Sequence, residues 1–260
     1  MDEPLKHGYE DLLSHLHIEA VPASRPFVWL SRGLSDMRDN LPASLAWGAA
    51  FAIVGYLILA FAADKPYLFT AAVSGFFLVG PLAAAGLYEI SRRHEKGMPC
   101  KLNDSIHGLF GHGDSLLYFG LFLAIAMISW ERISAILFAL FYDGDVPSVA
   151  NFYREVLTSG NYVHFLVAYF VIGGAIAALL FSLTAVALPM MMDRDTDIVT
   201  AMLASMRAVG HNLPAMFVWA GLIVALIAIG FATWMIGLAI TLPLVGHATW
   251  HAYRDLIHTD

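Results

Sequence analysis

The chain has 260 residues, of which 59% are hydrophobic and only 13% are charged. A soluble domain carries about a quarter charged residues, so this composition excludes an ordinary soluble protein and indicates a polytopic membrane protein. The net charge of −7 argues against nucleic acid as a partner. The single cysteine, Cys100, excludes an internal disulfide and a metal site with several cysteines.

Residues 1–24 are acidic and rich in histidine, and the chain has no early apolar run of the signal-peptide type. We therefore predict a cytoplasmic N-terminal tail over residues 1–24, followed by a single polytopic membrane domain over residues 25–260.

Long apolar stretches follow one another along this domain, and a membrane helix needs about 20 mostly apolar residues. The stretches cover residues 43–63, 67–88, 115–130, 162–192 and 213–253. The last is long enough for two short spans with a turn near Gly230. The sequence therefore predicts an all-α integral membrane protein with six transmembrane helices.

The third stretch ends at Glu131-Arg132, where a further apolar run over residues 133–142 begins. Charges at mid-membrane are unfavourable, so we expect this pair at the outer interface. The run that follows is either an outer interfacial segment or a continuation of a tilted helix.

Lysine and arginine are distributed unequally between the predicted loops. With both termini inside, the cytoplasmic set is Lys6, Arg25, Arg32, Arg38, Arg92, Arg93, Lys96, Lys101, Arg194, Arg207 and Arg254, and the outer set is Lys65, Arg132 and Arg154. Positive charge collects on the cytoplasmic side of a membrane protein. We therefore predict a protein of the bacterial inner membrane with N and C termini in the cytoplasm.

A short motif, Asn-Leu-Pro-Ala followed by tryptophan five residues after the proline, occurs twice. The copies are Asn40, Pro42 and Trp47, and Asn212, Pro214 and Trp219. Asparagine favours the N-cap of a helix, and proline is tolerated in the first turn. We expect each copy to be a hinge from an amphipathic surface helix to a membrane helix. In the first surface helix, Phe27, Leu30, Leu34 and Met37 share one face, and Asp36 lies elsewhere.

The segments that end these units also correspond. "GPLAAAGLYEISRR" (80–93) can be laid on "LPLVGHATWHAYRD" (242–255), which pairs Pro81 with Pro243, Tyr88 with Trp250, and Arg92 with Arg254. A weaker third match rests on Pro189. We predict three pseudo-repeated units, about 25–97, 98–195 and 196–258. Each contains an amphipathic cytoplasmic helix and an out-and-back helix pair, and parallel repeats are related by an axis near the membrane normal.

The segment "PMMMDRDTDIVTAMLASMRAVGHNLPAMFVWAGLIVALIAIGFATWMIGLAITLPLVGHATWHAYRDLI", together with "RPFVWLSRGLSDMRDNLPASLAWG" and "GPLAAAGLYEISRR", resembles a bacterial integral-membrane family of unknown function. Members are loosely labelled as subunit I of cytochrome c oxidase. The resemblance implies a multi-span inner-membrane protein and brings no established activity. The oxidase label does not fit, because that subunit has many more helices and intramembrane histidines on several of them.

Two histidines four residues apart, His247 and His251, share a face near the end of the chain. They are candidate ligands of copper, iron or haem, although two ligands make no complete site. The alternative is a polar helix end with Trp250 in an aromatic belt and Arg254 among the headgroups. His247 pairs with Ala85 between the units, so any special chemistry is expected at His247. Glu89 is expected to pair with a nearby arginine.

No complete catalytic constellation is recognisable in the sequence, so we predict no catalytic residue and no cofactor. The leading hypothesis is a non-catalytic accessory or assembly subunit of a larger membrane complex, which could be respiratory. Its partners would be the lipid bilayer and other membrane subunits. One alternative is a transporter or channel for a small or lipidic solute, with a cavity near Pro81, Pro189 and Pro243. Another is a metal or haem protein that uses His247 and His251.

Overall fold

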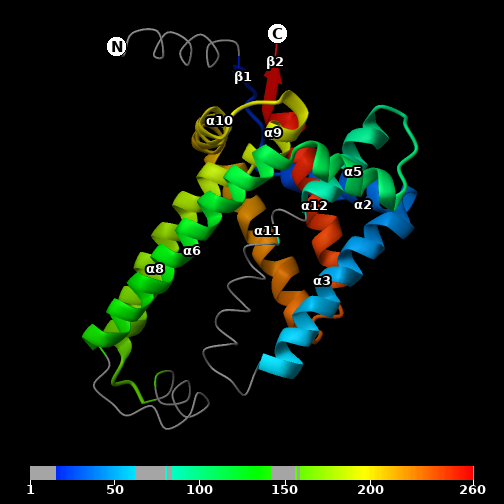
Figure 1. The fold of residues 1–260 in the computed structure, drawn as a ribbon. Coiled ribbons are helices and arrows are strands. Elements are labelled where there is room, and N and C mark those ends of the chain that lie inside the picture. Colours follow the sequence, from blue (N-terminus) through cyan, green and yellow to red (C-terminus); the bar gives the residue numbers. More distant parts are fainter. Residues whose placement is uncertain (1–15, 63–79, 81–83, 142–155, 157–158, 260) are drawn as a thin grey trace. The chain divides into compact units, whose positions relative to one another are not determined.

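The computed structural model describes residues 16–62, 80, 84–141, 156 and 159–259, and this part of the chain is almost wholly helical (Figure 1). The all-α membrane class is therefore confirmed. The chain forms two compact units, one of residues 122–181 and the other of the segments before and after it.

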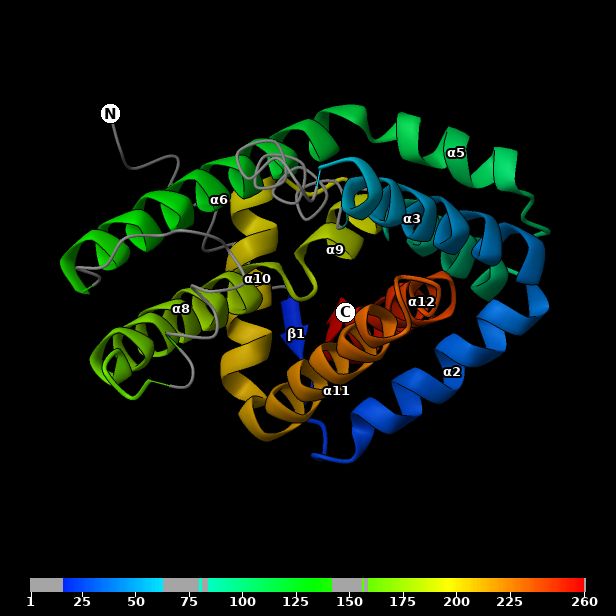
Figure 2. The ribbon, with the colours of Figure 1, turned by 90° about the horizontal axis from the view of Figure 1, so that it is seen from below.

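The larger unit contains short and long helices in alternation. Its elements are β1 (Leu16–Ile18), α2 (Arg25–Asp39), α3 (Leu41–Ala62), a helical segment over residues 84–95, α5 (Leu102–Gly111), the start of α6 (Gly113–Phe141), the end of α8 (Val163–Thr184), α9 (Ala187–Arg194), α10 (Ile198–His211), α11 (Leu213–Ala232), α12 (Leu238–Leu256) and β2 (Ile257–Thr259). Helix α10 is seen end-on in Figure 1 and at full length in Figure 2, so it lies across the direction of α11.

Helix α12 is the centre of this unit, because it packs against α2, α3, α9 and α11. Two glycines allow the close approach. A Cβ atom on Gly33 would lie 2.6 Å from the backbone nitrogen of Ala248, and one on Gly48 would meet the carbonyl oxygen of Ala239. Helices α2 and α3 therefore contact the backbone of α12 directly.

Four described helical segments are long and apolar enough to cross a membrane. They are Leu41–Ile58, Gly113–Phe141, Val163–Arg194 and Leu213–Ala232. The predicted span over residues 67–88 falls mainly outside the described residues. Helix α12, the sixth predicted span, is not among the four, because polar and aromatic side chains fill its second half. Six spans therefore stay a prediction.

The hinges lie where the repeated motif predicted them, but the asparagines act differently. The side chain of Asn212 makes no bond to the first turn of α11. Its amide instead donates to the carbonyl oxygens of Ala208 and Glu19, and its oxygen accepts from the backbone N–H of Val21. The side chain of Asn40 donates to the carbonyl oxygen of Asp36. The prediction of N-capping by Asn212 is wrong, because its side chain binds the preceding helix and the N-terminal segment.

The turn predicted near Gly230 lies between Ala232 and Leu238. Trp234 and Met235 there have positive φ angles, and the hydroxyl of Thr233 accepts from the N–H of Gly237. The connection between α11 and α12 is thus short, so the two helices run antiparallel and pack against each other.

In the smaller unit, α6 and α8 form a hairpin with an aromatic interior. Trp130 packs edge-on against Tyr169 with ring centroids 5.1 Å apart, and a Cβ atom on Gly173 would lie 2.9 Å from the Trp130 ring. Helix α6 runs without a break to Phe141. Of the two readings for residues 133–142, the structure therefore supports continuation of the helix.

Candidate functional site

His247 is the centre of a polar cluster inside the larger unit. Its side chain is fully buried (0% exposed), and both ring nitrogens contact serine hydroxyls. Nε2 lies 2.8 Å from Oγ of Ser44, on the second turn of α3, and Nδ1 lies 2.8 Å from Oγ of Ser91, on the 84–95 segment. A neutral imidazole donates one hydrogen bond and accepts another, so both serines can be satisfied at once.

Asp36 extends this cluster to the edge of the unit. Its Oδ1 lies 2.8 Å from Nδ1 of His94, and its Oδ2 lies 2.9 Å from Nε2 of His251. Ser91 also hydrogen-bonds to this carboxylate. Burial acts to raise the pKa of Asp36, but the bonds from both histidines and Ser91 outweigh it, so the pKa lies below its ordinary value. The carboxylate is therefore charged at neutral pH.

The local fold explains how four segments meet at this point. Helix α2 buries Trp29, Gly33 and Asp36 on one face, and Gly33 brings that face against Ala248 of α12. His247 and His251 then flank the contact, one turn apart. Helix α3 begins at Leu41, directly after α2, and this short link carries Ser44 to the same place.

Asp255 holds the start of α2 against the end of α12. Its carboxylate accepts from Nε of Arg25 at 2.6 Å, from Nε1 of Trp29 at 2.8 Å, and from Arg32 at 3.0 Å. Burial acts to raise the pKa of Asp255, but the bonds from Arg25 and Trp29 outweigh it, and the pKa lies below its ordinary value. Together with Asp36, this carboxylate fixes both ends of α2 to α12.

A second set of polar contacts joins the 84–95 segment and α9 to α12. Glu95 accepts from Nε1 of Trp250 and from Nε of Arg254, each at 3.0 Å. The hydroxyl of Tyr253 donates to Asp193 at 2.8 Å and accepts from Nε of Arg194 at 2.7 Å. Trp250 is 1% exposed, so its assignment to a lipid-facing aromatic belt is wrong. It is instead a buried donor to Glu95.

Glu89 pairs with an arginine, as the sequence predicted, and in fact with two. Its carboxylate oxygens lie 2.7 Å from Nε of Arg92 and 2.7 Å from Nε of Arg93. Burial acts to raise the pKa of Glu89, but these bonds outweigh it, so the pKa lies below its ordinary value. Gly108 of α5 packs on the Glu89 side chain. The pair therefore stabilises the contact with α5.

The repeated tryptophans occupy different surroundings. Trp47 donates from Nε1 to Oγ of Ser105 on α5, and Gly86 packs on its ring. Trp219 is fully buried and meets Trp29 edge-on at 5.7 Å, and its Nε1 has no hydrogen-bond partner among the described residues. The matched positions in sequence thus serve different contacts.

Residues that the sequence pattern groups together have different partners in the structure. His247 and His251 share a face of α12, but His247 contacts serines and His251 contacts Asp36. Pro189 and Pro243 are buried, and Pro81 falls outside the described residues. The cavity near these prolines therefore stays a prediction.

Metal or haem binding by His247 and His251 also stays a prediction. Within the part of the chain that the structure describes, no group of three or more histidine, cysteine, aspartate or glutamate side chains is arranged to hold a metal ion. Each ring nitrogen of His247 already contacts a hydroxyl, which a metal ion would have to displace.

Four residues of the cluster were missed from the sequence, namely Asp36, Ser44, Ser91 and His94. The signal for Asp36 was present, because Trp29, Gly33 and Asp36 recur at spacings of four and three and so share a helix face. A glycine between a tryptophan and an aspartate on one face indicates close helix packing. The two serines and His94 carry no comparable local pattern.

Comparison with known proteins gives one match. The family described as predicted integral membrane protein (DUF2189) matches residues 68–193. This range contains "GPLAAAGLYEISRR" but begins after "RPFVWLSRGLSDMRDNLPASLAWG" and ends before "GHATWHAYRDL". The resemblance before residue 68 and beyond residue 193 therefore stays a prediction. No curated protein and no solved structure matches the chain.

Proposed function

We propose that this integral membrane protein, whose residues 68–193 match the DUF2189 family of predicted integral membrane proteins, is an accessory or assembly subunit of a larger complex. The complex would lie in a bacterial inner membrane and could be respiratory. The proposal rests on the outward face of helix α8 in the α6–α8 hairpin.

The exposed surface of α8 carries small side chains beside large ones such as Phe170 and Val171. Phe165 and Tyr169 lie toward α6. Gly174, Ala175 and Ala178 are exposed on α8, and a Cβ atom on Gly174 would meet nothing within 4 Å. Lipid does not require small side chains, whereas a neighbouring helix packs closely against them. The exposed small residues Gly174, Ala175 and Ala178 therefore support contact with a helix of another subunit.

A test uses α8 variants of the full chain extracted in mild detergent. In Gly174→Leu with Ala178→Leu, we expect partners that copurify with the wild type to be lost, because leucine keeps two helix backbones apart. The matched control is Phe170→Leu with Leu179→Phe, which changes exposed large residues of the same helix. Retention of all partners by the Gly174→Leu, Ala178→Leu variant, or a wild type that purifies alone, would refute the subunit proposal.

The order of elements supports the proposed three-unit arrangement. Short helices α2, α5 and α10 each precede a long apolar helix, namely α3, α6 and α11. The break between them is one residue in each case, at Asn40, His112 and Asn212. We infer that these three units share one orientation, with their short helices on the cytoplasmic side.

A further inference from the structure

We propose that Asp36, Ser91 and His247 form a proton-exchange path that connects the buried imidazole of His247 with the solution through His94. The path is independent of the proposed subunit role. It is a site for the solvent proton, buried against the start of a candidate membrane-spanning helix.

The path is a continuous series of hydrogen bonds. His94, whose side chain is 37% exposed, lies 2.8 Å from Asp36, and Asp36 is bonded to Ser91. Ser91 is fully buried and lies 2.8 Å from Nδ1 of His247. The His94–Asp36 and Ser91–His247 contacts, each 2.8 Å, are within the range over which a proton passes between a donor and an acceptor. These polar side chains thus connect the half-buried His94 with the buried His247.

Each step conserves protons. A proton taken up by His94 moves from its Nδ1 to Oδ1 of Asp36. Once Asp36 is protonated, the Ser91 hydroxyl turns from the carboxyl group to Nδ1 of His247, which accepts in the tautomer that carries its hydrogen on Nε2. The carboxylic acid then gives its proton to Oγ of Ser91, while the Ser91 hydroxyl passes its own proton to Nδ1 of His247. His94 is left neutral and His247 becomes an imidazolium that donates to both serines. The reverse sequence returns the proton to the solution.

Ser44 contacts the same ring but does not lie on this path. Its Oγ is 2.8 Å from Nε2 of His247, on the opposite side of the ring from Ser91. Ser44 is itself fully buried. It therefore fixes the ring without leading to the surface, and it provides a control with the same chemistry and the same contact distance.

The charged groups around the path come from three segments. Helix α2 supplies Asp36 and, 3.5 Å from Nε2 of His94, Asp39. The 84–95 segment supplies His94, and α12 supplies His251 on the second oxygen of Asp36. Helix α3 contributes the uncharged Ser44.

The test measures exchange of the His247 ring proton with water by 15N NMR. The full chain is labelled at histidine and studied in detergent micelles, and the His247 signals are assigned by their loss in His247→Gln. In Ser91→Ala we expect exchange to slow at least tenfold, because the path is cut. Ser91→Thr keeps a hydroxyl and should restore the rate. Ser44→Ala removes a bond to the same ring but leaves the path intact, so it should slow exchange far less than Ser91→Ala.

His94→Gln provides a second cut if Ser91→Ala does not fold. Glutamine can still donate to Asp36 but cannot carry a proton, so exchange at His247 should again slow at least tenfold. An unchanged exchange rate in both Ser91→Ala and His94→Gln would overturn the proposal. Equal effects of Ser91→Ala and Ser44→Ala would also overturn it, because they would indicate a structural role for the two serines. Stoichiometric metal in the purified protein, lost in His247→Gln, would also overturn it.

Discussion

Single carboxylates in this protein hold elements that are far apart in sequence. Asp255 accepts from Arg25 and Trp29, and Asp36 accepts from His94 and His251. Because these bonds stabilise the charged carboxylate, each folded-state pKa lies below its ordinary value. Such a group contributes stability above its unfolded pKa, near 4, and this stability is lost as the pH falls through the folded pKa.

Asp255→Asn should therefore destabilise the protein in a pH-dependent way. At pH 6 we expect a loss of about 2 kcal/mol, typical of hydrogen bonds to a charged group, seen as a lower melting temperature by circular dichroism. Below about pH 4 the unfolded chain takes up the proton first, so the difference between the two proteins should shrink as the pH falls toward the lowered pKa of folded Asp255. Asp195→Asn, at an exposed carboxylate, is the control and should change little. A difference that is constant from pH 6 to pH 3 would contradict this account.

Residue-scale prediction from sequence succeeded where partners are local and failed where they are distant. Glu89 and its arginines are three and four residues apart on one helix, so their pairing follows from helical spacing. Asp36 and His251 are separated by 215 residues, and nothing in the local pattern relates them. Helical spacing places Asp36 away from the predicted apolar face of the surface helix, and tertiary packing nevertheless buries it.

At the scale of elements, apolar length and breaker residues predicted most of the helices. The hinges at Asn40 and Asn212 and the turn after Gly230 lie within a few residues of their predicted places. The contact between α2 and α12 was not predictable, because it depends on the shape of two surfaces. Gly33 lies against the backbone of Ala248, and hydrophobic periodicity describes only which face of a helix is apolar.

Two glycine substitutions should have opposite effects. Gly33→Ala places a Cβ atom 2.6 Å from the backbone nitrogen of Ala248, so α2 and α12 must move apart and the melting temperature should fall. Gly210→Ala on α10 meets nothing within 4 Å, and alanine is favoured over glycine in a helix by about 1 kcal/mol. That variant should therefore melt at a higher temperature. Equal shifts in the same direction would show that α2 does not need this contact.

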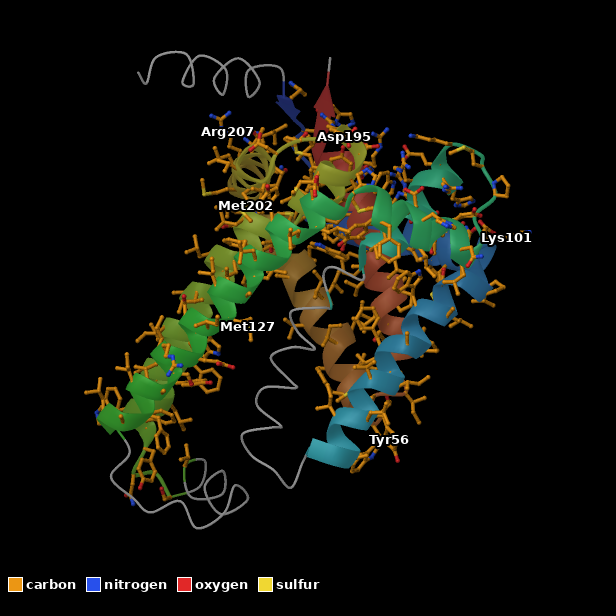
Figure 3. The ribbon with its side chains drawn as sticks, in the orientation of Figure 1. Tyr56, Lys101, Met127, Asp195, Met202 and Arg207 are labelled. Carbon is orange, nitrogen blue, oxygen red and sulfur yellow. The ribbon has the colours of Figure 1, made fainter. Side chains whose placement is uncertain are left out.

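For the whole molecule, composition predicted the membrane class, and the polar groups of the larger unit collect at one of its ends. Lys101, Asp195 and Arg207 lie at the end where the short helices gather, and Tyr56 lies at the opposite end of α3 (Figure 3). The distribution of cations predicts that the polar end faces the cytoplasm.

Orientation can be tested with single cysteines and a membrane-impermeant maleimide on intact cells. Burial raises the pKa of Cys100 to about 11, so this thiol reacts slowly, and Cys100→Ser gives a clean background. In that background Trp234→Cys, in the exposed turn after α11, should be labelled from outside. Arg207→Cys should be labelled only after the cells are opened. The reverse pattern would place the termini outside.

The bonds of Asp255 also set an order of events during synthesis. Its partner Arg25 precedes it by 230 residues, and β1 likewise pairs with β2 near the far end of the chain. At about 5–20 residues per second, α2 leaves the ribosome roughly 10–50 s before the residues that hold it. During this time α2 lacks its partner Asp255, while the later helices enter the bilayer. The contacts between α2 and α12 and between β1 and β2 at the polar end therefore form last, after α12 has been synthesised.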